Sequence, residues 1–168
     1  LVTPPHLKAS KADCTCLDSA SMNLGEQIEA MSDAALAGKR VVRLHTGDPS
    51  VYGAIREQMD LLEQEGISYE VVPGVSSFCA AAAALKAEYT LPDISQSVII
   101  TRMEGRTPVP EKEKMALMAA HGCTMVIFLS AGLLAPLTKE LLSGAYRPDT
   151  PAAIVYKASW PDEKILRC

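Results

Sequence analysis

Aromatic residues, basic residues and long apolar runs are scarce in this sequence of 168 residues. Aromatic side chains make up 5% of it, and no apolar run reaches the ~18 residues that a membrane-spanning helix needs. The 16 Lys and Arg are outnumbered by 20 Asp and Glu, which gives a net charge of −4. Because nucleic-acid binding needs a basic face for the phosphates, this balance argues against a nucleic-acid partner. The sequence therefore predicts neither a membrane protein nor a nucleic-acid-binding protein.

The five cysteines have no spacing that suggests a disulfide framework. Cys14 and Cys16 form a C-x-C pair that could bind a metal, but side chains that alternate along a strand favour two thiols that fill space. The odd count fits reduced thiols in a cytoplasm, and the first residues lack the charged and apolar regions of a secretion signal. The three histidines show no ligand spacing with one another or with any cysteine. We therefore predict a cytoplasmic protein without a metal site.

Helix and strand patterns alternate along the chain, which predicts parallel βαβ units and an α/β fold. Helices are expected at residues 23–37, 49–65, 78–85, 111–121 and 133–142. Strands are expected at 12–17, 40–46, 67–72, 97–101, 124–129 and, as the final strand, 152–156. A short turn is expected over residues 1–10. The irregular segment 88–96, which contains Pro92, is the expected linker between two α/β domains, residues 1–96 and residues 97–168.

The stretch 41–53 lies at the centre of the first predicted domain. A β-branched run stops at Gly47, and Asp48 followed by Pro49 is typical of a helix start, with Asp as N-cap and Pro at the first helical position. Gly47 lacks a Cβ and would let a ligand approach the backbone, while Asp48 could accept a hydrogen bond from a ribose hydroxyl or an amine. Plain helix capping is the simpler interpretation of this loop taken alone.

Three further loops follow predicted strands. Ser76 and Ser77 could cap the next helix or bind a ligand, and the small residues 130–132 leave room beside a strand end. Arg102 and Arg106 suit carboxylate recognition, because a guanidinium can donate two parallel hydrogen bonds; a solvated charged loop is the alternative. No nucleophile–base pair, Walker A motif or G-x-G-x-x-G motif is found. The residues by themselves therefore predict a small-molecule-binding α/β protein and no specific catalytic residue.

Two motifs, LHTGDPSVYGAIREQ at residues 44–58 and VVPGVSS at 71–77, closely resemble those of the tetrapyrrole (corrin/porphyrin) methylase family. Within that family, TRMEGRTP at 101–108 and ASWPDE at 158–163 are similar to enzymes that methylate ring carbon C11 of precorrin-4 or cobalt-precorrin-4 in cobalamin biosynthesis. The resemblance implies two α/β domains with parallel or mixed sheets and S-adenosylmethionine in a cleft between them. It also implies S-adenosylhomocysteine as product, a tetrapyrrole substrate and a cytoplasmic homodimer.

The resemblance also assigns site residues in this chain. The cofactor-binding residues that it implies are Thr46, Gly47, Asp48, Tyr52, Ser76, Ser77, Leu129 and Ala153. Leu129 matches an apolar position, and Ala153 matches a small residue near the adenine. Arg102, Glu104 and Arg106 are the predicted tetrapyrrole contacts, chiefly because two arginines suit a polycarboxylate.

The sequence departs from the family at its ends. Family members begin with a strand and a Gly-Pro-Gly-Asp-Pro type loop, and nothing like it occurs here. We therefore expect a chain truncated at both ends, with an N-terminal domain that lacks its first strand and an incomplete C-terminal domain. A non-catalytic fragment that binds cofactor or corrin, and a sister precorrin methylase acting at another ring carbon, are the alternatives.

Removing the charge of Arg102 or Arg106 is expected to raise the KM for the tetrapyrrole more than it weakens cofactor binding, because a guanidinium that binds a substrate carboxylate makes no contact with the cofactor. Steady-state kinetics and calorimetry on single Gln variants measure the two effects. The opposite pattern would place these arginines elsewhere.

Overall fold

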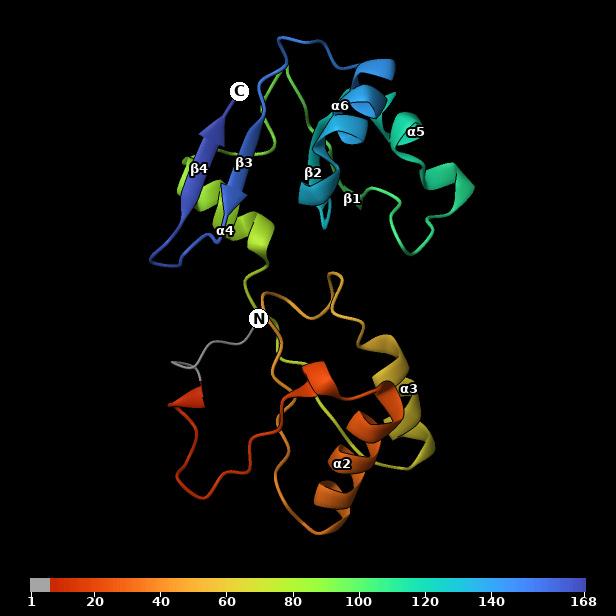
Figure 1. The fold of residues 1–168 in the computed structure, drawn as a ribbon, viewed down its shortest axis with the longest axis vertical. Coiled ribbons are helices and arrows are strands. Elements are labelled where there is room, and N and C mark those ends of the chain that lie inside the picture. The colour runs from red at the N-terminus through yellow and green to blue at the C-terminus, as the bar shows by residue number, and fades with distance from the viewer. Residues whose placement is uncertain (1–6) are drawn as a thin grey trace. The chain divides into compact units, whose positions relative to one another are not determined.

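The computed structural model describes residues 7–168 (Figure 1). The chain divides between Ser77 and Phe78 into two compact units. Of the turn predicted over residues 1–10, residues 1–6 lie outside the described residues. In the remainder, the N–H of Ser10 donates to the carbonyl of Leu7 (3.1 Å) and closes a turn. The domain boundary expected between residues 96 and 97 stays a prediction.

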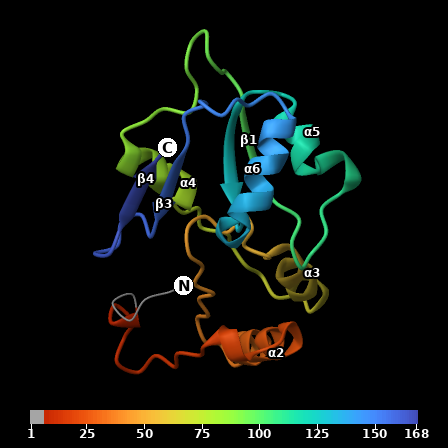
Figure 2. The same cartoon turned by 45° about the horizontal axis from the view of Figure 1, so that its top comes forward.

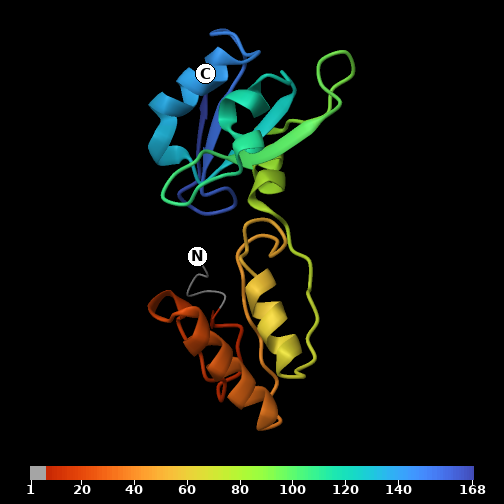
Figure 3. The same ribbon diagram turned by 90° about the vertical axis from the view of Figure 1, so that its right-hand side faces the viewer.

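Two α-helices, α2 (Leu24–Leu36) and α3 (Arg56–Gln64), run side by side in the first unit, after the short 3-10 helix η1 (Ser19–Ser21) (Figure 3). A capping box starts α2: Asn23 Oδ1 accepts from the N–H of Glu26 (3.0 Å), and Glu26 Oε2 accepts from the N–H of Asn23 (2.7 Å). Two amides that have no partner inside the helix are thereby satisfied. The predicted helix at 23–37 is confirmed.

The helix predicted from residue 49 begins only at Arg56, so that prediction is wrong at its N-terminus. Tyr52 and Ala54 have φ angles of 57° and 51°, in the left-handed region that a right-handed helix excludes. Asp48 caps no helix, because its Oδ1 accepts from the N–H of Ser50 (2.8 Å) and closes an Asx turn instead.

The strands predicted at 12–17, 40–46 and 67–72 are wrong, because these segments are irregular in the structure. A strand requires ladder hydrogen bonds to a neighbour, and β-branched composition supplies only a preference for a half-buried, pleated surface. Val42 and Val72 accordingly stay 76% and 70% exposed.

The second unit contains two two-stranded sheets (Figure 1). Strands β1 (Val98–Arg102) and β2 (Thr124–Phe128) pair in parallel, and Arg102 lies opposite Phe128. Strands β3 (Ala153–Tyr156) and β4 (Lys164–Arg167) form an antiparallel hairpin. The predicted α/β class with parallel and mixed sheets is confirmed. The strand predicted at 152–156 is not the final strand, because β4 follows it. The prediction of parallel units alone is incomplete, because β3 and β4 pair antiparallel.

Helix α4 (Ser77–Leu85) is joined to both sheets of this unit. The rings of Phe78 and Phe128 meet edge to face with centroids 6.4 Å apart, which attaches the helix to β2. The guanidinium of Arg167 donates to the carbonyl of Leu85 (3.0 Å), which attaches the C-terminal end of α4 to β4. Figure 2 shows α4 beside the β3–β4 hairpin from a second side.

The helix predicted at 111–121 is divided into the 3-10 helix η2 (Glu111–Glu113) and α5 (Met115–Ala119), because Lys114 between them is extended, with φ −56° and ψ 143°. Another 3-10 helix, η3 (Ala131–Leu133), leads into α6 (Leu134–Ser143), where a helix was predicted. Met115, Ala119 and Leu137 are buried between α5 and α6. Among the helices of residues 7–168, none is long and apolar enough to cross a membrane.

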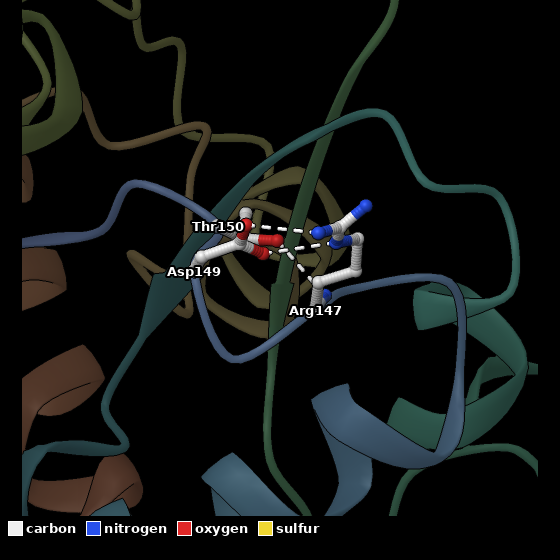
Figure 4. A network of polar contacts seen from close by, with 3 residues as sticks. All are labelled: Arg147, Asp149 and Thr150. Atoms are coloured by element: carbon white, nitrogen blue, oxygen red, sulfur yellow. Dashed lines mark hydrogen bonds and ion pairs between the residues drawn. The ribbon is translucent and has the colours of Figure 1, made fainter.

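A tight turn precedes β3 (Figure 4). The Nε and Nη2 atoms of Arg147 donate to the two carboxylate oxygens of Asp149 (2.9 and 3.0 Å), and the N–H of Arg147 donates to Thr150 Oγ1 (2.9 Å). An exposed ion pair adds little stability. Together with the N–H of Thr150, which donates to the carbonyl of Arg147 (3.0 Å), these hydrogen bonds close the turn.

Replacing Gly144 by Ala is expected to lower the free energy of unfolding by about 1–3 kcal/mol, measured by urea denaturation. A Cβ at this position would lie 2.6 Å from the Cβ of Ala119 and 2.7 Å from its carbonyl carbon, where α6 ends against α5. Gly132→Ala is the matched control, because a Cβ there meets nothing within 4 Å. Equal effects of the two substitutions would contradict the packing described here.

Candidate functional site

Two loops of the first unit, residues 46–50 and 73–77, are joined through the carboxylate of Asp48. Its Oδ2 accepts from the N–H of Gly74 (2.9 Å), and its Oδ1 accepts from the N–H of Ser50 (2.8 Å) and also from the Ser50 hydroxyl. Both carboxylate oxygens are therefore used, and three of about four acceptor positions are filled. One position is left for a donor from outside the protein.

The backbones of these loops are in direct contact. A Cβ built on Gly74 would lie 2.1 Å from the carbonyl oxygen of Gly47, and one built on Gly47 would lie 3.5 Å from Ser76 Cα. Gly47 also has φ +70°, which glycine adopts without strain. Ser76 is 6% exposed, whereas Ser77 and Thr46 are exposed beside it. Glycine is thus required at both positions, by space at Gly74 and by backbone conformation at Gly47.

The hydrogen bonds to Asp48 also affect its protonation. The Ser50 hydroxyl, followed by the amides of Gly74 and Ser50, lowers the pKa of Asp48 below its usual value. Asp48 therefore carries a full negative charge at neutral pH and acts only as an acceptor. Tyr52, which follows in the same loop, is exposed and has a left-handed φ of 57°.

Leu129 and the loop after Arg102 lie at one edge of the parallel sheet of the second unit, because parallel strands end at the same edge. Leu129 is 77% exposed and has φ +54°. A branched side chain in the left-handed region costs about 1–3 kcal/mol and persists only where the surroundings impose it, often at functional sites. An exposed, strained apolar residue at a strand end is a reasonable contact for a ligand.

Arg102 is engaged by its own loop. Its guanidinium donates to the carbonyls of Met103 (3.2 Å), Thr107 (3.1 Å) and Pro108 (2.8 Å). Glu104 and Arg106, in the same loop, are exposed. Arg102 therefore shapes the loop, and Arg106 offers the guanidinium that is more open to an external carboxylate.

Ser130 joins the ends of β1 and β2. Its Oγ accepts from the N–H of Met103 (2.9 Å) and donates to the carbonyl of Phe128 (2.7 Å), and the residue is 3% exposed. The sequence placed Ser130 in a small-residue loop but gave no sign of this bridge. Ser50 was missed as well, although Asp-Pro-Ser is typical of an Asx turn.

Ala153 is the first residue of β3, so it lies in the other sheet of the second unit. The hairpin tip between β3 and β4 is built around Lys157, whose Nζ lies 2.7 Å from Asp162 Oδ2 and 5.2 Å from the centroids of the Tyr156 and Trp160 rings. The hydrogen bond to Asp162 raises the pKa of Lys157, so its amine stays charged.

The structure thus brings together Gly47, Asp48, Ser76 and Ser77 in the first unit. In the second unit, it places Leu129 beside the loop of Arg102, Glu104 and Arg106. Over residues 7–168, no group of three or more His, Cys, Asp or Glu side chains could hold a metal ion.

Comparison with known proteins assigns the chain to one family. The chain matches the family described as Tetrapyrrole (Corrin/Porphyrin) Methylases over residues 4–168. It is 56% identical over 167 residues to the cobalt-precorrin-4 C(11)-methyltransferase of Methanocaldococcus jannaschii, covering 99% of this chain and 64% of that protein. The chain therefore spans about two thirds of the length of that curated relative.

Solved structures agree with this similarity. An X-ray structure of a cobalamin biosynthetic enzyme, cobalt precorrin-4 methyltransferase, matches with a TM-score of 0.97 and 52% identity, over 99% of this chain and 70% of that one. The uroporphyrin-III C-methyltransferase of Thermus thermophilus, solved in complex with S-adenosyl homocysteine, matches with a TM-score of 0.71 and 26% identity, over 86% of this chain and 63% of that one.

Asp48→Asn is expected to lower the free energy of unfolding most near neutral pH and least in acid. Because the folded-state pKa of Asp48 is lowered, its contribution is present above the unfolded pKa of about 3.9 and is lost as the pH falls through the folded pKa. Urea denaturation of wild type and variant at pH 7, 4 and 3 measures the difference. Asp93→Asn, which removes an exposed carboxylate of the second unit, is the control; the same pH dependence in both variants would contradict the prediction.

Proposed function

Because this chain belongs to the tetrapyrrole (corrin/porphyrin) methylases, we propose that its protein transfers a methyl group from S-adenosylmethionine to ring carbon C11 of cobalt-precorrin-4 or precorrin-4, in cobalamin biosynthesis. The observation that carries the proposal is the similarity to the cobalt-precorrin-4 enzymes over nearly the whole chain, which includes every loop described above. We further propose a cytoplasmic homodimer, as the resemblance to the family implies.

The residues present fit the proposed cofactor. Gly47 and Gly74 let the two loops pack closely against each other, and Asp48 keeps one acceptor position for a ribose hydroxyl or an amine. The full proposed set of cofactor contacts is Thr46, Gly47, Asp48, Tyr52, Ser76, Ser77, Leu129 and Ala153. When bound, S-adenosylmethionine supplies a methyl group already activated by a sulfonium. These residues then only have to bind and orient it.

Arg102, Glu104 and Arg106 are the proposed contacts to the tetrapyrrole. Three N–H groups of Arg102 donate to its own loop, so we assign most of the carboxylate recognition to Arg106. Glu104 can accept a hydrogen bond from a pyrrole N–H or repel a wrongly placed carboxylate. The loop would thereby position the ring system rather than take part in bond making.

Methyl transfer between two bound molecules depends chiefly on their alignment, which can lower a barrier by ~7–11 kcal/mol. Such a reaction requires no nucleophile on the protein, which agrees with a sequence that shows no nucleophile–base pair. A sister methylase that acts at another ring carbon is the second candidate, and the match to the uroporphyrin-III enzyme favours it. The higher identity to the cobalt-precorrin-4 enzymes favours C11.

Incubating the full-length protein with S-adenosylmethionine and cobalt-precorrin-4 is expected to yield S-adenosylhomocysteine and a product with one added methyl group, located at C11 by NMR. Asp48→Ala is expected to weaken cofactor binding about tenfold or more by calorimetry, because the loops that it joins would separate. Asp93→Ala is the control.

Each alternative gives a different result in this experiment. Binding without turnover would favour a non-catalytic binding protein, and a methyl group at another carbon would favour the sister enzyme. An unchanged cofactor affinity in Asp48→Ala would remove Asp48 from the site.

A further inference from the structure

We propose that Ser130 is a positioning residue, whose hydroxyl holds the loop after β1 and the loop after β2 in a defined relation to each other. The bridge thereby fixes the position of Leu129, a proposed cofactor contact, relative to the Arg102–Arg106 loop, the proposed tetrapyrrole contact. The inference rests on the proposed function and adds to it a residue that contacts neither ligand.

The hydroxyl of Ser130 extends the pairing of the two strands by one step. The last pair of the parallel ladder is Arg102 with Phe128. Beyond it, the N–H of Met103 donates to Ser130 Oγ (2.9 Å), and the same hydroxyl donates to the carbonyl of Phe128 (2.7 Å). Because the residue is 3% exposed, water cannot readily replace either hydrogen bond.

Hydrogen bonds on both sides of Leu129, the residue with the left-handed backbone, restrain its conformation. Phe128 precedes Leu129, and its carbonyl accepts from the Ser130 hydroxyl. The carbonyl of Ser130 in turn accepts from the N–H of Leu133 (2.9 Å), and this hydrogen bond closes the single turn of η3. The left-handed backbone of Leu129 is therefore held from both sides, as such a conformation requires.

The same hydroxyl holds one end of the arginine loop. Met103 is the first residue of that loop, and its amide is the donor to Ser130. The opposite end is closed by Arg102, which donates to the carbonyls of Thr107 and Pro108. Without the Ser130 bridge, the loop would stay closed on itself but would lose its fixed relation to Leu129.

The chain offers a matched control at the other end of the same two strands. Ser95 Oγ accepts from the N–H of Thr124 (2.8 Å), the first residue of β2, and donates to the carbonyl of Ser97 (2.8 Å), just before β1. This bridge has the same chemistry and joins the same strands. It lies at their amino ends, away from Leu129 and the arginine loop.

The experiment compares Ser130→Ala, Ser95→Ala and Ser130→Thr in the full-length protein. Both alanine variants are expected to lower the urea midpoint, since each loses one bridge. Only Ser130→Ala is expected to lower kcat for methyl transfer, by about 10- to 100-fold, because misalignment of bound reactants costs rate rather than affinity. Its cofactor Kd, measured by calorimetry, is expected to change much less, and Ser130→Thr, which keeps the hydroxyl, is expected to recover most of the rate.

Amide hydrogen exchange gives a readout that needs no activity. Met103, whose amide loses its acceptor, is expected to exchange faster in Ser130→Ala and to be unchanged in Ser95→Ala. Leu133, whose amide donates to the backbone carbonyl of residue 130, keeps its acceptor in both variants. Equal loss of kcat in both alanine variants, an unchanged kcat in Ser130→Ala or unchanged exchange at Met103 would each overturn the proposal. If the wild type methylates no precorrin, the proposed function fails, and the exchange at Met103 still decides whether Ser130 holds the two loops.

Discussion

A backbone amide without a partner in a strand or helix needs another hydrogen-bond acceptor. In both groups of candidate residues, a side-chain oxygen is that acceptor. In the first unit the acceptor for Gly74 is the carboxylate of Asp48, and in the second unit the acceptor for Met103 is the hydroxyl of Ser130. Each bond joins segments that are far apart in sequence. Two polar side chains therefore connect the loops proposed to hold the ligands.

The choice of acceptor follows from its surroundings. Asp48 is only partly buried and accepts from three donors, which stabilise its negative charge. Ser130 is almost fully buried, and a charged acceptor there would be costly unless it were paired. A hydroxyl fits that position because it accepts one hydrogen bond and donates another, so that no group remains unsatisfied.

Backbone strain is distributed in a related way. Gly47 adopts a left-handed conformation without a side-chain penalty, as does Gly122 between α5 and β2. Leu129 and Tyr52 adopt the same region with side chains that disfavour it. Both are among the proposed cofactor contacts. Strain at these residues agrees with a site in which side chains are held ready for a ligand before it binds.

Features that depend on neighbours within a few residues were determined by the sequence alone. Helices α2 and α4 and the segments of β1 and β2 lie close to their predicted positions. The loops that follow β1 and β2 were also recognised, although the roles of their residues stay predictions.

Only the tertiary structure decided where α3 starts, which predicted strands form no ladder, and that β4 pairs with β3. It also decided the hydrogen-bond partners of Asp48, Arg102 and Ser130. The physical reason is the distance along the chain. A helix cap is satisfied three residues away, whereas a ladder or a bridge needs a donor or acceptor whose position depends on how remote segments fold together.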